Sequence, residues 1–171
     1  MSTSPEVWLR GPVSDIAPVL QPAAHALLQA REEVEALAPS VSTDDLWKPL
    51  GAASAGFHLL HLAGALERLF TYARGELLDD TQKAAARAES SPHPELDGAA
   101  LVAIVAAAVE QALAQLRATP ASTVFDERKV GRAGLPSNVL GLLFHGAEHC
   151  TRHAGQFITT VRLITSAQSR P

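Results

Sequence analysis

The feature that most constrains the fold of this 171-residue chain is the spacing of its apolar residues, which recur three and four apart along four long segments. That spacing places them on one side of an α-helix, whereas the alternation typical of half-buried strands is scarce. Alanine and leucine, both strong helix formers, dominate these segments. The sequence therefore predicts an all-α fold.

Four helices are predicted, with boundaries set by caps, glycines and prolines. They extend from about Asp15 to Leu37, Ala53 to Arg74, Asp97 to Ala118 and Ser137 to Ser166. Pro18 and Pro22 fall in the first turns of the first segment, so that helix is expected to begin about a turn later. Because the connections are able to reverse the chain, we expect an antiparallel four-helix bundle.

Two connections are polar. The first, from Asp79 to Asp97, is expected to hold a short exposed helix. The second, from Ala121 to Pro136, is also long and carries a charged run flanked by glycines. Long ordered connections frequently carry function, so this loop is predicted to lie near the mouth of the site.

Length and charge limit the classes of protein to which the chain belongs. With 171 residues and 18.0 kDa, residues 1–171 are predicted to form a single domain. The net charge is -4 and the lysines and arginines are scattered, so neither nucleic acid nor an anionic membrane is an expected partner. Cys150 is the only cysteine and the N-terminus lacks a secretory pattern, which together predict a cytoplasmic location.

Histidines give the strongest functional signal. Five of the seven fall in two of the predicted helices: His58 and His61 in one, and His145, His149 and His153 in another. Residues four apart lie one turn above each other, so His149 and His153 are able to direct their imidazoles at a shared point. A third histidine from a facing helix would complete a set of three nitrogens for a divalent metal, with a further position left open.

The third ligand is expected to be His61 and not His58, because the small residues Ala63 and Gly64 follow His61 and leave room for an ion. His58 and His145 are predicted to line the pocket, since His145 is rotated about 80° around the helix axis from His153. Gln156, one turn beyond His153, is a candidate to line the pocket and to orient that imidazole, although a packing role is an equal alternative.

The alternative to a metal site is a set of structural histidines. A single histidine on an apolar helix is usually a core residue that hydrogen-bonds a carbonyl or carboxylate. Five such residues on two helices would all need polar partners, and this apolar sequence offers few. The set as a whole therefore favours metal ligation. Cys150, beside His149 in sequence, points about 100° away and is expected to pack as a small apolar residue.

Two stretches, HLAGALERLFTYARGE and EHCTRHAGQ, resemble the DinB/YfiT-like family of metal-dependent hydrolases. The resemblance extends over most of the chain, and its more specific parts are the paired histidines and the Gly-Gln that follows them. It implies an antiparallel four-helix bundle, often a homodimer, that holds one divalent metal on His61, His149 and His153. Family members of known activity include transferases and isomerases that use low-molecular-weight thiols such as bacillithiol or mycothiol.

Three functions remain open at this point. The leading prediction is a metal-dependent enzyme, S-transferase-like, that acts on a small molecule with a low-molecular-weight thiol; three imidazoles suit several metals, and zinc or nickel is expected. Hydrolysis by a metal-bound hydroxide would need a general base, for which Glu67 and Glu148 are the nearby carboxylates. A non-catalytic metal- or ligand-binding dimer would need a fourth protein ligand, His58 or His145.

Overall fold

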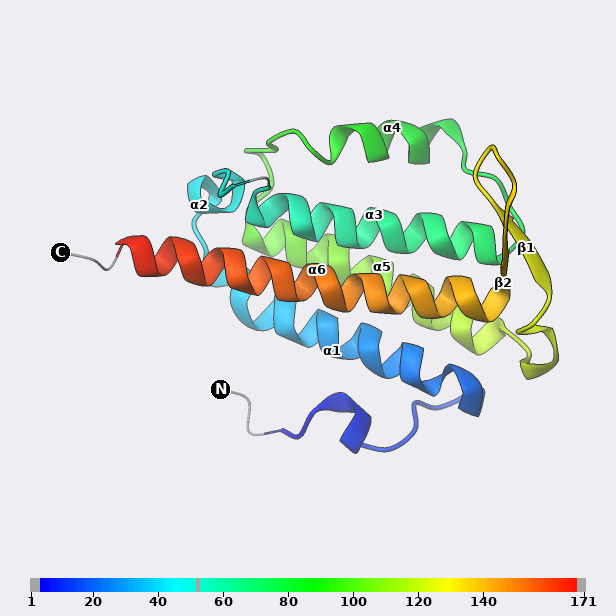
Figure 1. Ribbon diagram of the computed structural model, residues 1–171. Helices are drawn as coiled ribbons and strands as arrows, with labels where there is room; N and C mark the ends of the chain where they lie inside the picture. Colours follow the sequence, from blue (N-terminus) through cyan, green and yellow to red (C-terminus); the bar gives the residue numbers. More distant parts are fainter. Residues whose placement is uncertain (1–3, 52, 169–171) are drawn as a thin grey trace.

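The computed structural model describes residues 4–51 and 53–168, and its centre is a bundle of four long helices (Figure 1). These are α1 (Gln21–Leu37), α3 (Ala55–Ala73), α5 (Gly98–Ala118) and α6 (Val139–Gln168). The smaller elements are α2 (Thr43–Trp47), α4 (Asp80–Ala88), β1 (Glu127–Val130), β2 (Leu135–Asn138) and single 3-10 turns at Val7–Leu9, Pro18–Leu20, Ala38–Ser40 and Ala121–Thr123. The prediction of an all-α four-helix bundle is confirmed.

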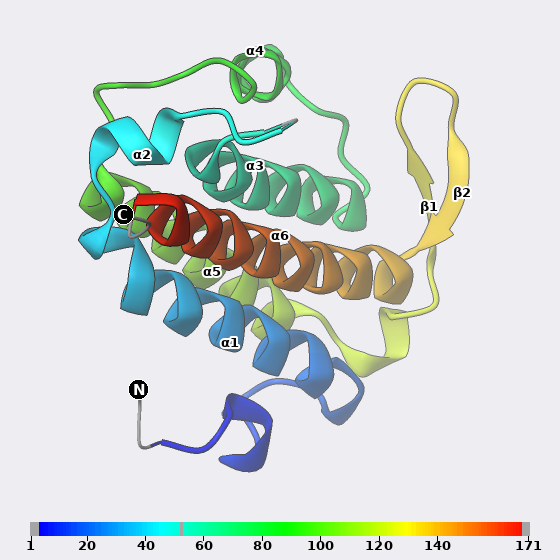
Figure 2. The same cartoon turned by 60° about the vertical axis from the view of Figure 1, so that its left-hand side comes forward.

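The direction of the helices follows from the connections between them. In Figures 1 and 2, α3 and α6 lie side by side and run antiparallel, and α1 and α6 run in the same direction. α5 runs parallel to its neighbour α3, because the segment that contains α4 carries the chain back along the outside of the bundle. The long connection thus returns the chain to the end at which α3 began, while the connections on either side of it reverse the chain as expected.

Local signals account for most helix boundaries. The Ser54 hydroxyl accepts a hydrogen bond from the Phe57 N–H at 3.1 Å, and Asp97 caps α5 in the same way at 2.8 Å. α1 begins at Gln21 after a 3-10 turn, as the two prolines predicted. The cap of α6 was predicted one residue too early: Asn138, and not Ser137, accepts the Gly141 N–H at 2.7 Å.

The connection from Ala121 to Pro136 is more regular than predicted. β1 and β2 pair as an antiparallel hairpin, with Glu127 opposite Asn138 and Val130 opposite Leu135. Gly131 and Gly134 have φ values of 67° and 63°, which L-residues with side chains rarely adopt, and they allow the tight turn. Arg128 Nε donates to the Ala73 carbonyl at 2.8 Å, so the hairpin is attached to the C-terminal end of α3.

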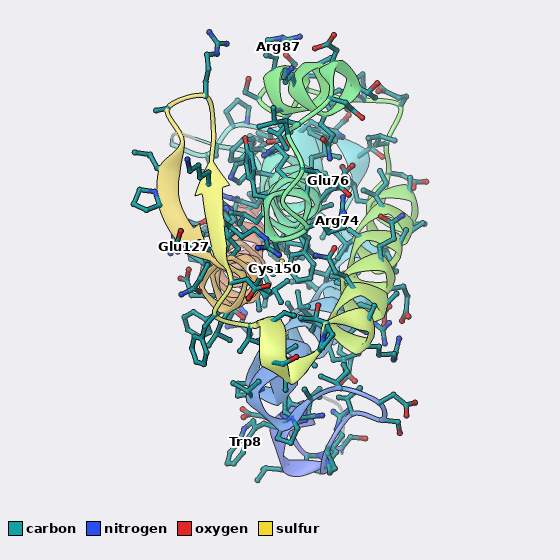
Figure 3. All side chains as sticks on the ribbon, turned by 90° about the vertical axis from the view of Figure 1, so that its right-hand side faces the viewer. Trp8, Arg74, Glu76, Arg87, Glu127 and Cys150 are labelled. Atoms are coloured by element: carbon teal, nitrogen blue, oxygen red, sulfur yellow. The ribbon has the colours of Figure 1, made fainter. Side chains whose placement is uncertain are left out.

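The core is formed by apolar side chains from all four long helices, among them Leu27, Leu59, Leu101 and Phe157, which are fully buried. Cys150 lies inside the bundle in the end-on view of Figure 3, where Trp8 and Arg87 project outward. Burial raises the pKa of the Cys150 thiol to about 12, so it packs as a small apolar side chain.

α5 is long and apolar enough to cross a membrane by length and composition alone. A core helix of a soluble bundle passes the same test, and α5 packs against α3 and α1. One such helix is weak evidence for a membrane span, and the expectation that the protein has no membrane partner stays a prediction.

Candidate metal centre

α3 and α6 make the most extensive helix pair in the structure and bring together four of the five clustered histidines. His58 and His61 lie in the N-terminal half of α3, and His149 and His153 lie in the middle of α6. Each pair is three or four residues apart, so each shares one face of its helix, and the two faces meet. The histidine faces therefore lie inside the interface and not on the outer surface of the bundle.

His61, His149 and His153 each offer one nitrogen, and these nitrogens lie within 4.8 Å of one another. His61 Nε2 and His149 Nε2 lie 3.1 Å apart. Two nitrogens each about 2.0–2.1 Å from one ion would be about 2.9–3.4 Å apart at octahedral to tetrahedral angles. The spacing of these two nitrogens therefore suits a shared ion.

Glu89, a residue that no sequence pattern indicated, fixes the tautomer of His61. Its Oε2 lies 2.7 Å from His61 Nδ1. An ionised carboxylate only accepts, so the proton of neutral His61 sits on Nδ1 and the lone pair on Nε2 faces the other histidines. Carboxylates commonly orient metal-binding imidazoles in this way. No spacing rule connects the two residues, because Glu89 lies 28 positions away in a polar segment.

Glu89 is itself held by α3. Its side chain is buried, with 8% exposed, and it pairs with Arg68 at 2.5 Å and 3.3 Å. Gly64 permits this close approach, since a Cβ atom at that position would overlap Glu89 Oε1. The buried carboxylate is thus neutralised by Arg68 and directed at His61, and Gly64 is required because the side chain of Glu89 lies against the α3 backbone.

His58 performs a related role for His153. The Nδ1 atoms of the two rings are 3.2 Å apart, and both residues are buried. A hydrogen bond between them occupies Nδ1 of His153 and leaves its Nε2 for a ligand. Phe57 in turn restricts His61, since the two rings are stacked with centroids 5.2 Å apart and an interplanar angle of 14°. These neighbours restrict the orientations that the imidazoles adopt.

Three of these histidines, His58, His149 and His153, have lowered pKa values that favour the neutral form. Burial lowers the pKa of His153 to about 3, and the nearby His149, His61 and His58 add to the shift. Burial is also the main cause of the lowered pKa of His149 and of His58. Neutral imidazoles have the lone pair that a metal ion requires, so near neutral pH no proton needs to be displaced from these rings.

His149 has a hydrogen-bond partner at only one ring nitrogen in the described part of the chain. Its Nδ1 is buried and unpartnered, which costs about 1–3 kcal/mol whether or not a metal is bound. Its Nε2 faces Nε2 of His61 at 3.1 Å. His61, His149 and His153 therefore form a donor set able to hold a metal ion.

Other predicted residues lie farther from the centre. His145 is half exposed, with its ring centroid 5.6 Å from that of His149 and its Nδ1 3.4 Å from Glu148 Oε2. Gln156 is exposed and makes no hydrogen bond to His153 in the described part of the chain; His58 occupies that position instead. Glu148 pairs with Arg152, four residues along α6, at 2.6 Å.

Two expectations about the surroundings are wrong. The hairpin between Ala121 and Pro136 does not lie at the mouth of the histidine cluster, because it contacts the end of α3 at Ala73, about 18 Å along the helix from His61. Glu67 is on another face of α3, where it lines a cavity with residues of α4 and α5. The carboxylate that hydrogen-bonds to His61 is Glu89.

Comparisons with known proteins agree with this arrangement. The family model of the DinB superfamily matches residues 20–157, which include every histidine of the cluster. The crystal structure of a conserved protein from Enterococcus faecalis has a TM-score of 0.68 and 17% sequence identity, covering 88% of this chain and 99% of that one. At that identity the likeness shows the fold alone. No curated protein matches the chain significantly.

Proposed function

Because the chain belongs to the DinB superfamily, we propose that it is a metal-dependent enzyme that acts on a small molecule with a low-molecular-weight thiol, in the manner of an S-transferase. One divalent transition metal, zinc or nickel, binds through His61, His149 and His153. The observation that carries the proposal is the convergence of three imidazole nitrogens within 4.8 Å of one another in a partly buried interface.

The chemistry that such an ion supplies is a lowered pKa for a bound thiol, since three neutral ligands leave its double positive charge intact. Glu89 keeps the proton of His61 on Nδ1. His58 holds the ring of His153, and Phe57 shields His61 from water. His145 lies at the exposed rim beside Glu148.

The surrounding carboxylates favour thiol chemistry over the hydrolase alternative. Hydrolysis needs a general base within hydrogen-bond reach of a water molecule. Glu89 is engaged by His61 and Arg68, and Glu148 is engaged by Arg152. Neither has a free oxygen directed at the histidines. A thiol activated by the ion alone needs no such base.

The absence of a fourth ligand from the donor set favours an enzyme over a non-catalytic module. A closed structural site has four protein ligands. In the described residues the donor group contains three histidines; His58 bonds to His153, and His145 is half exposed. An open position is what a catalytic site requires. We further propose a cytoplasmic homodimer that binds neither nucleic acid nor membrane.

The first experiment is elemental analysis of untagged protein, comparing wild type with His153→Ala and His145→Ala. We expect about one divalent ion per chain in wild type and in His145→Ala, and loss of the ion in His153→Ala. Equal metal content in the two variants, or none in metal-replete wild type, would overturn the site.

The thiol assignment is tested with Co²⁺-substituted protein. Addition of a low-molecular-weight thiol is expected to produce a sulfur-to-cobalt charge-transfer absorption, which His153→Ala lacks. The proposal of thiol chemistry would be wrong if metal-loaded protein showed no such absorption with any thiol tested and transferred no thiol to an acceptor. The metal site would stand in that case.

A further inference from the structure

α4 is held over the bundle by its ends and not by packing. It contains no buried residue. At its start, the Gln82 amide donates to Glu67 Oε1 at 3.1 Å and to Thr71 Oγ1 at 2.9 Å. At its end, Glu89 bonds to Arg68 and His61. Figure 2 shows α4 standing away from α3, so polar contacts at both ends support a helix with little apolar contact between them.

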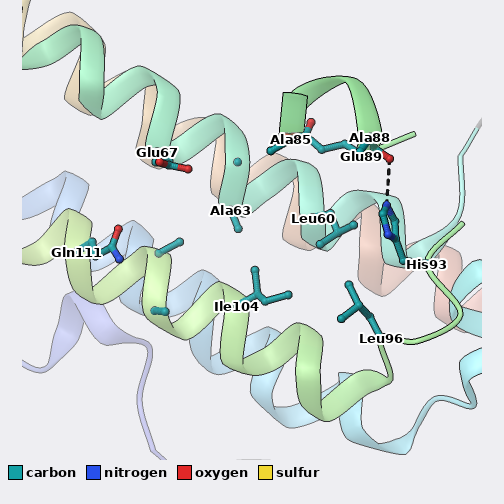
Figure 4. A pocket seen from close by; sticks show the side chains of 13 residues that line it. Leu60, Ala63, Glu67, Ala85, Ala88, Glu89, His93, Leu96, Ile104 and Gln111 are labelled. Carbon is teal, nitrogen blue, oxygen red and sulfur yellow. Dashed lines mark hydrogen bonds between the residues drawn. The ribbon is translucent and has the colours of Figure 1, made fainter. Parts of the chain in front are cut away.

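A cavity of about 440 Å³ lies beneath α4, between α3 and α5. Pockets for small molecules span about 300–1,000 Å³ and are mostly apolar with a few polar groups. The walls here follow that composition: Leu60 and Ala63 from α3, Ile104 and Ala108 from α5, and Ala85 and Ala88 from α4 (Figure 4). The side chains that α4 contributes between its ends are alanines, which leave the space below it open.

Two of the polar groups on the wall are already occupied. Both oxygens of Glu89 are bonded, one to Arg68 and the other to His61 and Arg68. His93 uses Nε2 on the Ala88 carbonyl and Nδ1 on Glu95. Both residues are therefore already engaged in hydrogen bonds within the protein.

Glu67 and Gln111 are the polar groups that remain, and they face each other from α3 and α5 at one end of the cavity (Figure 4). Glu67 forms no ion pair with any described residue, although one of its oxygens accepts from Gln82. The Gln111 amide makes no hydrogen bond within the described residues. The cation that lines an adjoining pocket with Glu67 and Gln111 is Arg74, but it directs its guanidinium to Glu76, Gln115 and Thr71. This end of the cavity thus carries a carboxylate without an ion pair among the described residues, which favours a cation.

We infer that the cavity beneath α4 binds a small molecule with an apolar body and a protonated amine, the amine lying at Glu67 and Gln111 and the body between Leu60, Ile104 and Ala85. An anionic group would meet the Glu67 carboxylate and be disfavoured. None of the three candidate metal ligands lines this cavity, although Glu89, which bonds to His61, lies between the two sites. The cavity site therefore does not depend on the proposed metal chemistry.

The test uses three probes with the same aromatic body and different head groups: phenethylamine, phenethyl alcohol and phenylacetate. Binding is measured by chemical-shift titration of the full chain after removal of metal, and repeated in His153→Ala to exclude amine binding at the histidines. We expect saturable binding of phenethylamine with shifts in α3, α4 and α5, weaker binding of the alcohol, and none of the acid.

Two matched pairs of variants locate the site. Ala85→Leu fills the cavity from an exposed helix and is expected to abolish binding, whereas Ala84→Leu, the neighbouring residue that does not line the cavity, leaves it unchanged. Glu67→Gln is expected to weaken phenethylamine about threefold to tenfold, the effect of one partly exposed ion pair. Glu33→Gln, which removes the same charge from α1, is the control.

Two outcomes would overturn the inference. The first is no binding of phenethylamine, or equal binding in Ala85→Leu and Ala84→Leu. The second is equal affinity for all three head groups, or no loss in Glu67→Gln, which would leave an apolar pocket without the amine specificity. Because metal is removed throughout, neither outcome bears on the metal centre.

Discussion

The interface between α3 and α6 has two halves that differ in chemistry. Toward the hairpin end, Leu66 and Phe70 pack against the α6 backbone at Gly146, where a Cβ atom would come within 2.8 Å of the Phe70 ring. In the other half, His58 and His61 meet His149 and His153. The same two helices thus form a close apolar contact at one end and a cluster of imidazoles at the other.

The two halves meet two different requirements of this interface, stability and ligand binding. The apolar half is stabilised by burial and close packing alone. The histidine half places neutral imidazoles in a buried setting and leaves His149 Nδ1 without a partner in the described residues. We infer that the apolar half contributes stability and that the histidine half contributes binding at some cost in stability.

The largest expected effect is on the apolar half. Phe70→Ala removes a ring that is 3% exposed, and the free energy of unfolding is expected to fall by about 3–5 kcal/mol. Phe125→Ala, at a residue that is 72% exposed, is the matched control and is expected to cost little. Denaturant titration measures both. Equal free energies of unfolding in the two variants would show that the apolar half does not contribute the stability assigned to it.

The next effect is on the histidine half. Glu89→Gln keeps the shape of the side chain but removes the charge that orients His61, so metal affinity is expected to fall about 10- to 100-fold. Glu67→Gln, the same change on another face of α3, is expected to leave metal affinity unchanged. Competition with a chromophoric chelator gives both constants. Equal affinities in the two variants would show that Glu89 does not position His61.

A smaller, graded effect concerns pH and the metal-free protein. His58, His149 and His153 have pKa values below the ordinary 6.5 when folded, so the unfolded chain binds more protons as the pH falls below that value. The free energy of unfolding should therefore decrease from about pH 7 toward acid. Denaturant titrations at several pH values give the free energy of unfolding as a function of pH. This free energy should change less steeply with pH in His153→Gln than in wild type, and an identical pH dependence would contradict the expectation.

The smallest effect is expected at Gln156. This residue is exposed and makes no hydrogen bond to His153 in the described structure, so Gln156→Ala should change neither the metal affinity nor the melting temperature. Both are measured alongside His58→Ala, which removes the actual neighbour of His153 and is expected to weaken metal binding. A large loss in Gln156→Ala alone would restore the role that the sequence suggested.

Much of the site could be read from local spacing. His149 and His153 are four residues apart on a predicted helix, and helix geometry alone places their rings on one face. Likewise, the sequence identifies Ser54 as a cap candidate, because capping is an interaction between residues three apart. Glu89 could not be found in this way, since its contact with His61 joins two segments 28 residues apart.

The sequence by itself determined the four helices, most of their ends and the histidine-bearing faces, because periodicity and capping depend on neighbours along the chain. Only the tertiary structure decided that α5 runs parallel to α3, that the hairpin lies away from the histidines, and that α4 encloses a cavity next to Glu89. Those features depend on contacts between distant segments, and such contacts have no fixed spacing in the sequence.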